Sequence, residues 1–281
     1  MPCLIGRNIA VLLCFSRIAL GQDDPRDRVF YPGDSEGVKP LAGKLLGNVW
    51  LDQKAIWTSP FRMDRHNAKW WLLFTGATAA LIATDKHTSN FFENGPTQVR
   101  WGNNLSEIGA AYTLIPIAAG FYLGGAIADD SKARETGILG AEALLDGLIV
   151  QEILKPIAGR NRPDATEDKG KWFAGGASFP SGHSIESWAL ASVVAHEYSH
   201  EKWVPFVAYG LSTLVSSARF TAQQHYLSDI LAGSAIGWFT GTYVYRTHEQ
   251  HANHVRQGKP QVTPIIQPST GTFGIALAFG K

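Results

Sequence analysis

The chain has little cysteine and almost no net charge. Of its 281 residues only Cys3 and Cys14 are cysteines, and both lie within the first fifteen. This excludes a disulfide framework or a cysteine zinc site for the rest of the chain. The formal net charge is only +1, so no basic surplus indicates a nucleic-acid partner. Internal repeats are also absent, and the length fits one sizeable domain with appendages.

The first 21 residues have the pattern of a secretory signal. Arg7 gives a basic start, residues 9–15 are apolar, and Ala19-Leu20-Gly21 forms a small-x-small cleavage site before Gln22. Residues 22–68 are then polar and rich in glycine, proline and charge, which indicates a polar lead-in. We therefore expect a mature chain that starts near Gln22 and folds outside the cytoplasm.

Apolar periodicity predicts an all-α fold. Helical runs are expected at about 68–84, 106–128, 133–154, 184–198, 203–218 and 227–247. About six helices of this length predict a helical bundle over residues 69–248, with the functional loops at one end. In the tail, 249–281, residues 270–281 alternate weakly and predict a short strand or hairpin.

Two short clusters in the second half place histidines beside groups that can use them. His225 and Asp229 are four residues apart at the start of an apolar run, so on a helix both lie on one face, and the carboxylate can fix the tautomer of the imidazole. Ser181-Gly182-His183 follows Pro180 and leads into another helical run. A helix that begins there offers free N–H groups to an anion and puts His183 in its first turn.

The remaining candidates are cationic. Lys155 and Arg162 flank a loop broken by proline and glycine, and Arg219 precedes His225 by six residues. A guanidinium matches the oxygens of a phosphoryl group. Lys155, Arg160 and Arg162 could equally form a solvated basic loop, so the prediction of a phosphoryl-transfer site rests on all the clusters together.

In this combination the clusters resemble the three signature motifs of the type 2 phosphatidic acid phosphatase and vanadium haloperoxidase superfamily. The matching segments are Lys155-x6-Arg162-Pro163, Pro180-Ser181-Gly182-His183 and Arg219-x5-His225-x3-Asp229. The resemblance covers roughly residues 70–248. It implies the helical bundle of that superfamily and a phosphatase that needs no metal. Vanadate is then an inhibitor.

The resemblance also implies a role for each matching residue. His225 attacks phosphorus, Asp229 orients it, and His183 protonates the leaving group. The implied phosphate-binding residues are Lys155, Arg162, Ser181, Gly182 and Arg219. One departure is visible, because the third motif usually opens with serine and arginine, and here Ala218 precedes Arg219.

Three functions stay open at this point. The first is a phosphatase acting on a phosphorylated small molecule or on a lipid phosphate. The second is a haloperoxidase that holds vanadate as its cofactor in the same site, and the third is a non-enzymatic envelope or membrane protein that keeps the fold. The segment 164–179 between the first two motifs, which includes Lys169, Lys171, Trp172 and Phe173, is expected to overhang the pocket and set specificity. Its alternative is an ordinary loop with one aromatic anchor. The substrate and the oligomeric state stay undetermined.

Membrane association is the second open question. Residues 108–127 carry no charge over the length of a membrane span, but Glu142, Asp146 and Glu152 lie in another predicted helix, and bilayers disfavour such a segment. The mean hydropathy is −0.06. We therefore expect a soluble or peripheral periplasmic enzyme that resembles the bacterial class A acid phosphatases. The alternative is an integral inner-membrane protein with an outward-facing site.

Overall fold

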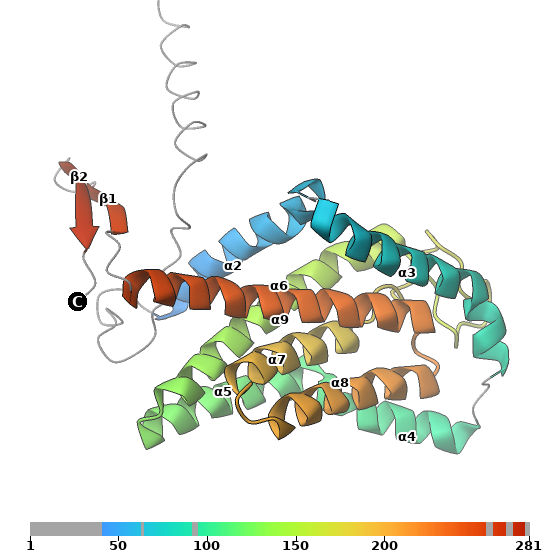
Figure 1. Cartoon of the computed structure of the whole chain (residues 1–281). Helices are drawn as coiled ribbons and strands as arrows, with labels where there is room; N and C mark the ends of the chain where they lie inside the picture. The colour runs from blue at the N-terminus through green and yellow to red at the C-terminus, as the bar shows by residue number, and fades with distance from the viewer. Residues whose placement is uncertain (1–40, 63–64, 92–94, 257–260, 268–271, 279–281) are drawn as a thin grey trace, which may run out of the picture. The chain divides into compact units, whose positions relative to one another are not determined.

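The computed structural model describes residues 41–62, 65–91, 95–256, 261–267 and 272–278. The predicted signal segment 1–21 and the first part of the lead-in lie outside these residues. The helices up to Ala252 belong to one compact unit. This unit is a bundle of α-helices, which confirms the predicted all-α fold class (Figure 1).

The described helices are more numerous than predicted. In chain order the elements are α2 (Leu41–Thr58), the 3-10 turn η1 (Ser59–Arg62), α3 (Arg65–Phe91), α4 (Pro96–Ser106), the 3-10 turn η2 (Glu107–Gly109), α5 (Ala111–Ala128), α6 (Ser131–Ala158), α7 (Gly182–Glu197), α8 (Trp203–Thr221) and α9 (Leu227–Arg256). The six predicted segments correspond to α3 and to α5 through α9. Helices α2 and α4 are additional.

Helix α2 falls within the predicted polar lead-in, yet it packs on α6. Asn48 Nδ2 donates to Glu142 Oε2 at 3.3 Å, and Gln53 Nε2 donates to Asp146 Oδ1 at 2.9 Å. Because these contacts are polar, the inward face of α2 has no apolar stripe for sequence periodicity to detect. The bundle therefore includes a helix that precedes residue 69, the predicted start of the phosphatase domain.

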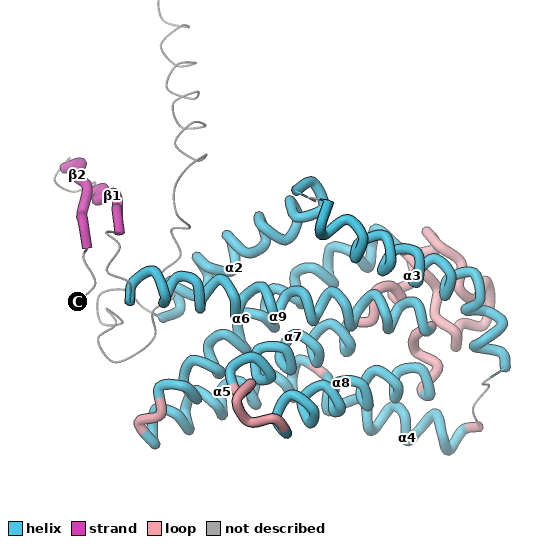
Figure 2. Tube along the Cα trace, viewed as in Figure 1, coloured by secondary structure: helices cyan, strands magenta, loops and turns pink. Residues whose placement is uncertain are grey.

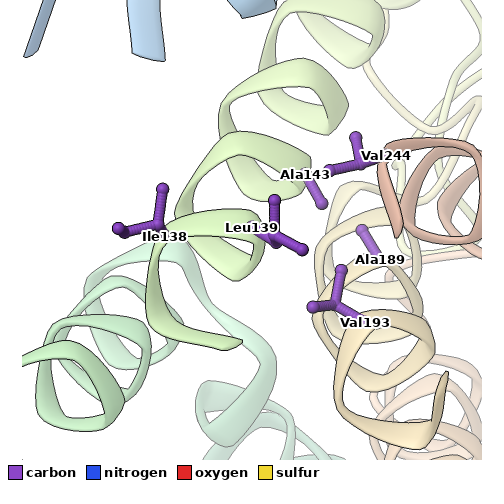
Figure 3. Close-up of a cluster of buried hydrophobic side chains, with 6 residues drawn as sticks. All are labelled: Ile138, Leu139, Ala143, Ala189, Val193 and Val244. Atoms are coloured by element: carbon purple, nitrogen blue, oxygen red, sulfur yellow. The ribbon is translucent and has the colours of Figure 1, made fainter. Parts of the chain in front are cut away.

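The core forms where α6, α7 and α9 meet. Figure 3 shows its buried side chains, which are Ile138, Leu139, Ala143, Ala189, Val193 and Val244. Helix α9 approaches the backbone of α7 closely, since a Cβ atom at Gly237 would lie 2.1 Å from the carbonyl oxygen of Ile185. Small residues at this contact hold α9, and the residues at its start, in a fixed position against α7.

The loops that carry the candidate residues gather at one end of this bundle. Segment 159–181, between α6 and α7, lies beside α3 (Figure 2). Segment 222–226, between α8 and α9, contacts segment 159–181, where Gln224 donates to Asp164. Helix α6 ends at this level and α7 begins there. The bundle therefore brings together residues that are as far as 143 positions apart in the sequence, such as Asp85 and Ser228.

The C-terminal hairpin belongs to a second compact unit and is described by itself. Strands β1 (Gln261–Gln267) and β2 (Thr272–Ala278) pair antiparallel, with Gln261 opposite Ala278 and Gln267 opposite Thr272. This confirms the strand or hairpin predicted within residues 270–281.

Much of the bundle surface is apolar. Within the described residues, one helical stretch, Pro96–Ala128, is long and apolar enough to cross a membrane, and 22% of its most apolar window is buried. Large apolar side chains are also exposed on α8, including Trp203 and Phe206. In contrast, Glu142 and Asp146 of α6 are fully buried inside the bundle.

Candidate active site

The three predicted clusters converge at the loop end of the bundle. Lys155 is in the last turn of α6, His183 in the first turn of α7, and Arg219 in the last turn of α8. Burial, followed by the charges of Arg219, Lys155 and Arg162, lowers the pKa of His183 to about 3. Because all three cations act on this one imidazole, they surround a common space.

His225 sits just before α9 and is 2% exposed. Its Nδ1 atom lies 2.7 Å from the backbone carbonyl oxygen of Ser178. A carbonyl only accepts hydrogen bonds, so Nδ1 carries the proton and Nε2 keeps its lone pair. Burial, together with Arg219 and Arg162, lowers the pKa of His225 well below its usual value. The ring is therefore neutral and nucleophilic at Nε2.

Asp229 lies one turn after His225, as predicted, but it does not bond the ring. Its Oδ2 atom is 3.9 Å from His225 Nδ1, which is too far for a hydrogen bond. Instead Asp229 accepts from the hydroxyl of Ser178 at 2.6 Å and from the backbone N–H of Tyr226 at 2.9 Å. The carboxylate thus acts on the imidazole through Ser178, whose carbonyl fixes the tautomer.

Arg160 holds Asp229 from the other side. Its guanidinium is 2% exposed, with 2.5 Å between Nη1 and Asp229 Oδ1 and 2.8 Å between Nη2 and Asp85 Oδ2. The same group lies 4.7 Å from the ring centroid of Trp172 and 4.2 Å from that of Tyr226. Arg160 is therefore a buried structural cation, and the reading of it as part of a solvated basic loop is wrong.

Asp85 comes from α3 and was not among the predicted residues. It also accepts from the backbone N–H of Ser228 at 3.2 Å and from the Ser228 hydroxyl. Burial raises the pKa of Asp229 to about 6, against Arg160 and the hydrogen bonds that Asp229 accepts. Arg160, the Ser178 hydroxyl and the Tyr226 backbone N–H therefore keep Asp229 ionised at neutral pH, and Asp85 holds Arg160 in place.

The start of α7 forms as predicted. Ser181 precedes the helix, and no side chain caps the N–H groups of its first turn. A Cβ atom at Gly182 would lie 1.9 Å from Gln151 Oε1 and 3.2 Å from Lys155 Nζ, so any larger residue here would displace the ends of these two side chains. The helix N-terminus is thereby brought next to the ammonium of Lys155, and both can bind the same anion.

Three of the cations at this site have no ion pair. Among the described residues, no carboxylate lies within ion-pair distance of Lys155, Arg162 or Arg219, whereas the neighbouring Arg160 has two. Arg162 Nη1 donates to the side-chain amide oxygen of Gln224. Arg219 is 6% exposed and its Nε atom has no acceptor in the described part of the chain. Such a group of partly buried cations is suited to hold an anion.

The departure at Ala218 has a structural counterpart. Ser216 accepts from Trp188 Nε1 at 3.2 Å, and Ser217 is exposed, so neither adjacent serine bonds Arg219. The hydroxyl that accepts from Arg219 Nη1, at 3.1 Å, belongs to Ser106 at the end of α4. No sequence signal could have indicated Ser106, because it lies 113 positions away.

The segment predicted to overhang the site is anchored by Trp172, which packs on Phe179 with 5.2 Å between ring centroids. Lys171 pairs with Asp168 at 2.7 Å on its exposed side, and Phe173 is 82% exposed. A cavity of about 460 Å³ lies between this segment and α3. The aromatic anchor is present, and a role in specificity stays a prediction.

A cluster of carboxylates forms elsewhere in the bundle, where the sequence showed none. Asp52, Glu142 and Asp146 are buried, and their oxygens lie within 4.8 Å of one another. They come from α2 and α6, which are far apart in the sequence. Asp146 is nine residues before Lys155, about 13 Å along the helix. The cluster is therefore separate from the histidine site.

Comparison with known proteins agrees with the fold. The fold resembles the crystal structure titled as the first transmembrane PAP2 type phosphatidylglycerolphosphate phosphatase from Bacillus subtilis, with a TM-score of 0.53 at 22% identity over 65% of this chain and 96% of that one. Residues 136–252 match the family described as the PAP2 superfamily. This matched stretch contains all three motifs, and the family is the one that the motifs resemble.

Two curated proteins are similar over about half of the chain. A lipid A 1-phosphatase from Porphyromonas gingivalis is 29% identical over 51% of this chain and 31% of its own length. A PA-phosphatase related-family protein from Dictyostelium discoideum is 32% identical over 45% of this chain and 52% of its own length. The match thus spans about a third to a half of the curated relatives.

Proposed function

We propose that the protein is a phosphatase that hydrolyses a lipid phosphate through a phosphohistidine intermediate. The observation that carries this proposal is a set of three cations that have no ion pair within the described part of the chain, together with two neutral histidines and a helix N-terminus. The cations are Lys155, Arg162 and Arg219. A phosphoryl group supplies the negative charge that this site lacks, and its three oxygens suit the two guanidiniums and the N–H groups at Gly182.

In the first step, Nε2 of His225 attacks phosphorus and the bond to the leaving oxygen breaks. The negative charge of the bound phosphoryl group opposes the cations that lower the pKa of His183, so His183 can take up a proton on binding and pass it to the leaving oxygen. In the second step, water loses a proton to His183 and attacks the phosphohistidine, which frees phosphate and restores His225. Because side chains neutralise the phosphoryl oxygens, no metal is required.

An apolar groove next to the site favours a lipid among phosphate esters. The groove has a volume of about 560 Å³ and lies between α5, α7 and α8. At the end next to the site, the groove is lined by Ser187, which is one turn after His183, and by Val215, which is one turn before Arg219. From Ser187 to Tyr198 it follows α7 for about 16 Å. Half the hydrocarbon thickness of a bilayer is about 15 Å, so the groove matches the acyl region of one leaflet.

The exposed apolar surface favours the integral-membrane alternative over the soluble one. The segment Pro96–Ala128 exposes Tyr112, Leu123 and Ile127. Of the α6 carboxylates that bilayers would disfavour, Glu142 and Asp146 face the interior of the bundle, whereas Glu152 is exposed. We therefore propose that the protein is embedded in a membrane, with the site on the extracytoplasmic side. We expect it to stay on membranes after washing with carbonate and to be released by detergent. Release by carbonate alone would support the soluble alternative.

The function is tested by phosphate release from a series of alkyl phosphates of increasing chain length, in detergent and with EDTA present. We expect KM to fall as the chain lengthens, because each buried methylene contributes about 0.8 kcal/mol. Vanadate, which mimics the five-coordinate transition state, should inhibit. A requirement for added metal would contradict the mechanism, and peroxide-dependent halide oxidation without phosphate release would support the haloperoxidase alternative.

Two matched variants on α8 test the groove. Leu211 lines it and Leu214 does not, although the two side chains are 51% and 45% exposed. Leu211→Trp is expected to raise KM for the longest substrate roughly tenfold, the equivalent of about two buried methylenes, and to leave the shortest one unchanged. Leu214→Trp is the control for the added indole. Equal effects on both substrates would remove the groove from the lipid site.

A further inference from the structure

Glu186 is a buried carboxylate, 4% exposed, one turn beyond His183 on α7. It lies outside the motifs that define the site. Gln151 of α6, which is 5% exposed, donates from Nε2 to Glu186 Oε1 at 2.9 Å. A carboxylate held in this way inside a bundle, so close to a phosphate site, needs an explanation beyond packing.

The contacts of Gln151 connect Glu186 to the site. Gln151 and Lys155 are four residues apart, so both lie on the same face of α6. Gly182 of α7 packs against both, since its Cβ atom would contact Gln151 Oε1 and Lys155 Nζ. Lys155 therefore stands at the level of the helix N-terminus, with Gln151 and Glu186 one turn deeper in the bundle.

The charged groups around Lys155 shift the pKa of its ammonium group in opposite directions. Burial lowers the pKa of Lys155, and the positive charges of Arg162 and Arg219 lower it further. Only Glu152 and Glu186 act in the opposite direction. Glu152 is the larger influence, but it is exposed and water screens its charge, whereas Glu186 is buried. Burial raises the pKa of Glu186 to about 7, against the hydrogen bond from Gln151 and the charge of Lys155. Charge on Glu186 and charge on Lys155 thus support each other.

We propose that Glu186, held by Gln151, is a positioning residue that keeps Lys155 charged and directed at the phosphate site. The proposal rests on the proposed function for its role in catalysis, although the coupling of the two side chains does not depend on it. Glu186 does not touch the substrate. It compensates for the two guanidiniums, which would otherwise favour a neutral lysine at the place where a cation is needed.

Glu186→Gln is the direct test, because an amide keeps the acceptor for Gln151 and removes the charge. We expect KM and the inhibition constant of vanadate to rise roughly three- to tenfold. The alkaline limb of kcat/KM should move down by about one pH unit, since Lys155 then loses its proton more easily. Glu152→Gln removes the exposed carboxylate that also faces Lys155, and is expected to change each constant less than about twofold because water screens its charge. Glu186→Asp should restore part of the effect.

A second measurement is independent of catalysis. The rate at which Lys155 is methylated by formaldehyde and a borohydride reagent, followed by mass spectrometry across a pH series, reports its protonation. The midpoint should fall in Glu186→Gln and stay in place in Glu152→Gln. An unchanged midpoint in both Glu186→Gln and Glu186→Asp would overturn the proposal. A shifted midpoint in a protein that releases no phosphate would contradict the proposed function and leave the coupling intact.

Discussion

His225→Ala is expected to lose essentially all phosphate release, together with the covalent intermediate. The imidazole is buried and neutral, and its proton is held on Nδ1 by the Ser178 carbonyl, so Nε2 is the atom prepared to attack phosphorus. Rapid quenching with labelled substrate should trap an acid-labile, base-stable phosphoenzyme in the wild type and none in the variant. Turnover that persists in His225→Ala would exclude the phosphohistidine.

The control for this variant is His196→Ala. The Nδ1 atom of His196 also lies 2.7 Å from a backbone carbonyl oxygen, that of Ser192, but far along α7 from the site. His183→Ala completes the comparison. It should slow the reaction of alkyl phosphates by roughly 10²- to 10⁴-fold and that of activated aryl phosphates far less, because a good leaving group needs no proton. Equal losses would remove His183 as the acid.

The largest expected effect on stability comes from Arg160→Met. This change leaves Asp85 and Asp229 buried without their cation, which typically costs about 3–5 kcal/mol. The melting temperature in detergent should fall by roughly 6–20 °C. Arg162→Met, two residues on, is the matched control. The side chain of Arg162 donates a hydrogen bond to the neutral Gln224, so we expect little loss of stability and a clear loss of phosphate binding.

A double variant shows whether Asp85 acts through Arg160. Asp85→Asn combined with Arg160→Met should be less destabilising than the sum of the single changes. Arg160→Met alone leaves the Asp85 carboxylate without its cation, and Asp85→Asn removes that unpaired charge. Purely additive melting temperatures would mean that the two side chains contribute separately. In that case α3 would not support the catalytic carboxylate.

The sequence predicted those elements that depend on residues close together in the chain. The helices with an apolar face, the start of α7 at Ser181-Gly182, and the spacing of His225 and Asp229 all follow from neighbours within one or two turns. Fold class was therefore accessible from periodicity, and the grouping of Lys155, Arg162 and Arg219 from the motifs. The structure confirms the helices and brings these residues together, while their roles in catalysis remain proposals.

The parts that sequence reasoning missed depend on tertiary packing. Ser178, Ser106 and Asp85 contact the site only because separate helices meet at one end of the bundle, and a serine or an aspartate in isolation carries no signal of this. The partner of the His225 ring was misassigned for a related reason. Helical spacing places Asp229 on the correct face, but it cannot show that a backbone carbonyl from another loop takes the hydrogen bond.

The contacts of Asp85 and Ser106 also determine how short a fragment of the chain can be and still form the complete site. The stretch of family similarity begins at residue 136, and both side chains lie before it. A fragment cut at that point would keep every motif residue and yet leave Arg160 without one of its two carboxylates and Arg219 without its hydroxyl. The stretch of chain that matches the family is thus shorter than the stretch that forms the site. Helices α3 and α4 must therefore be retained in any shortened form of the protein.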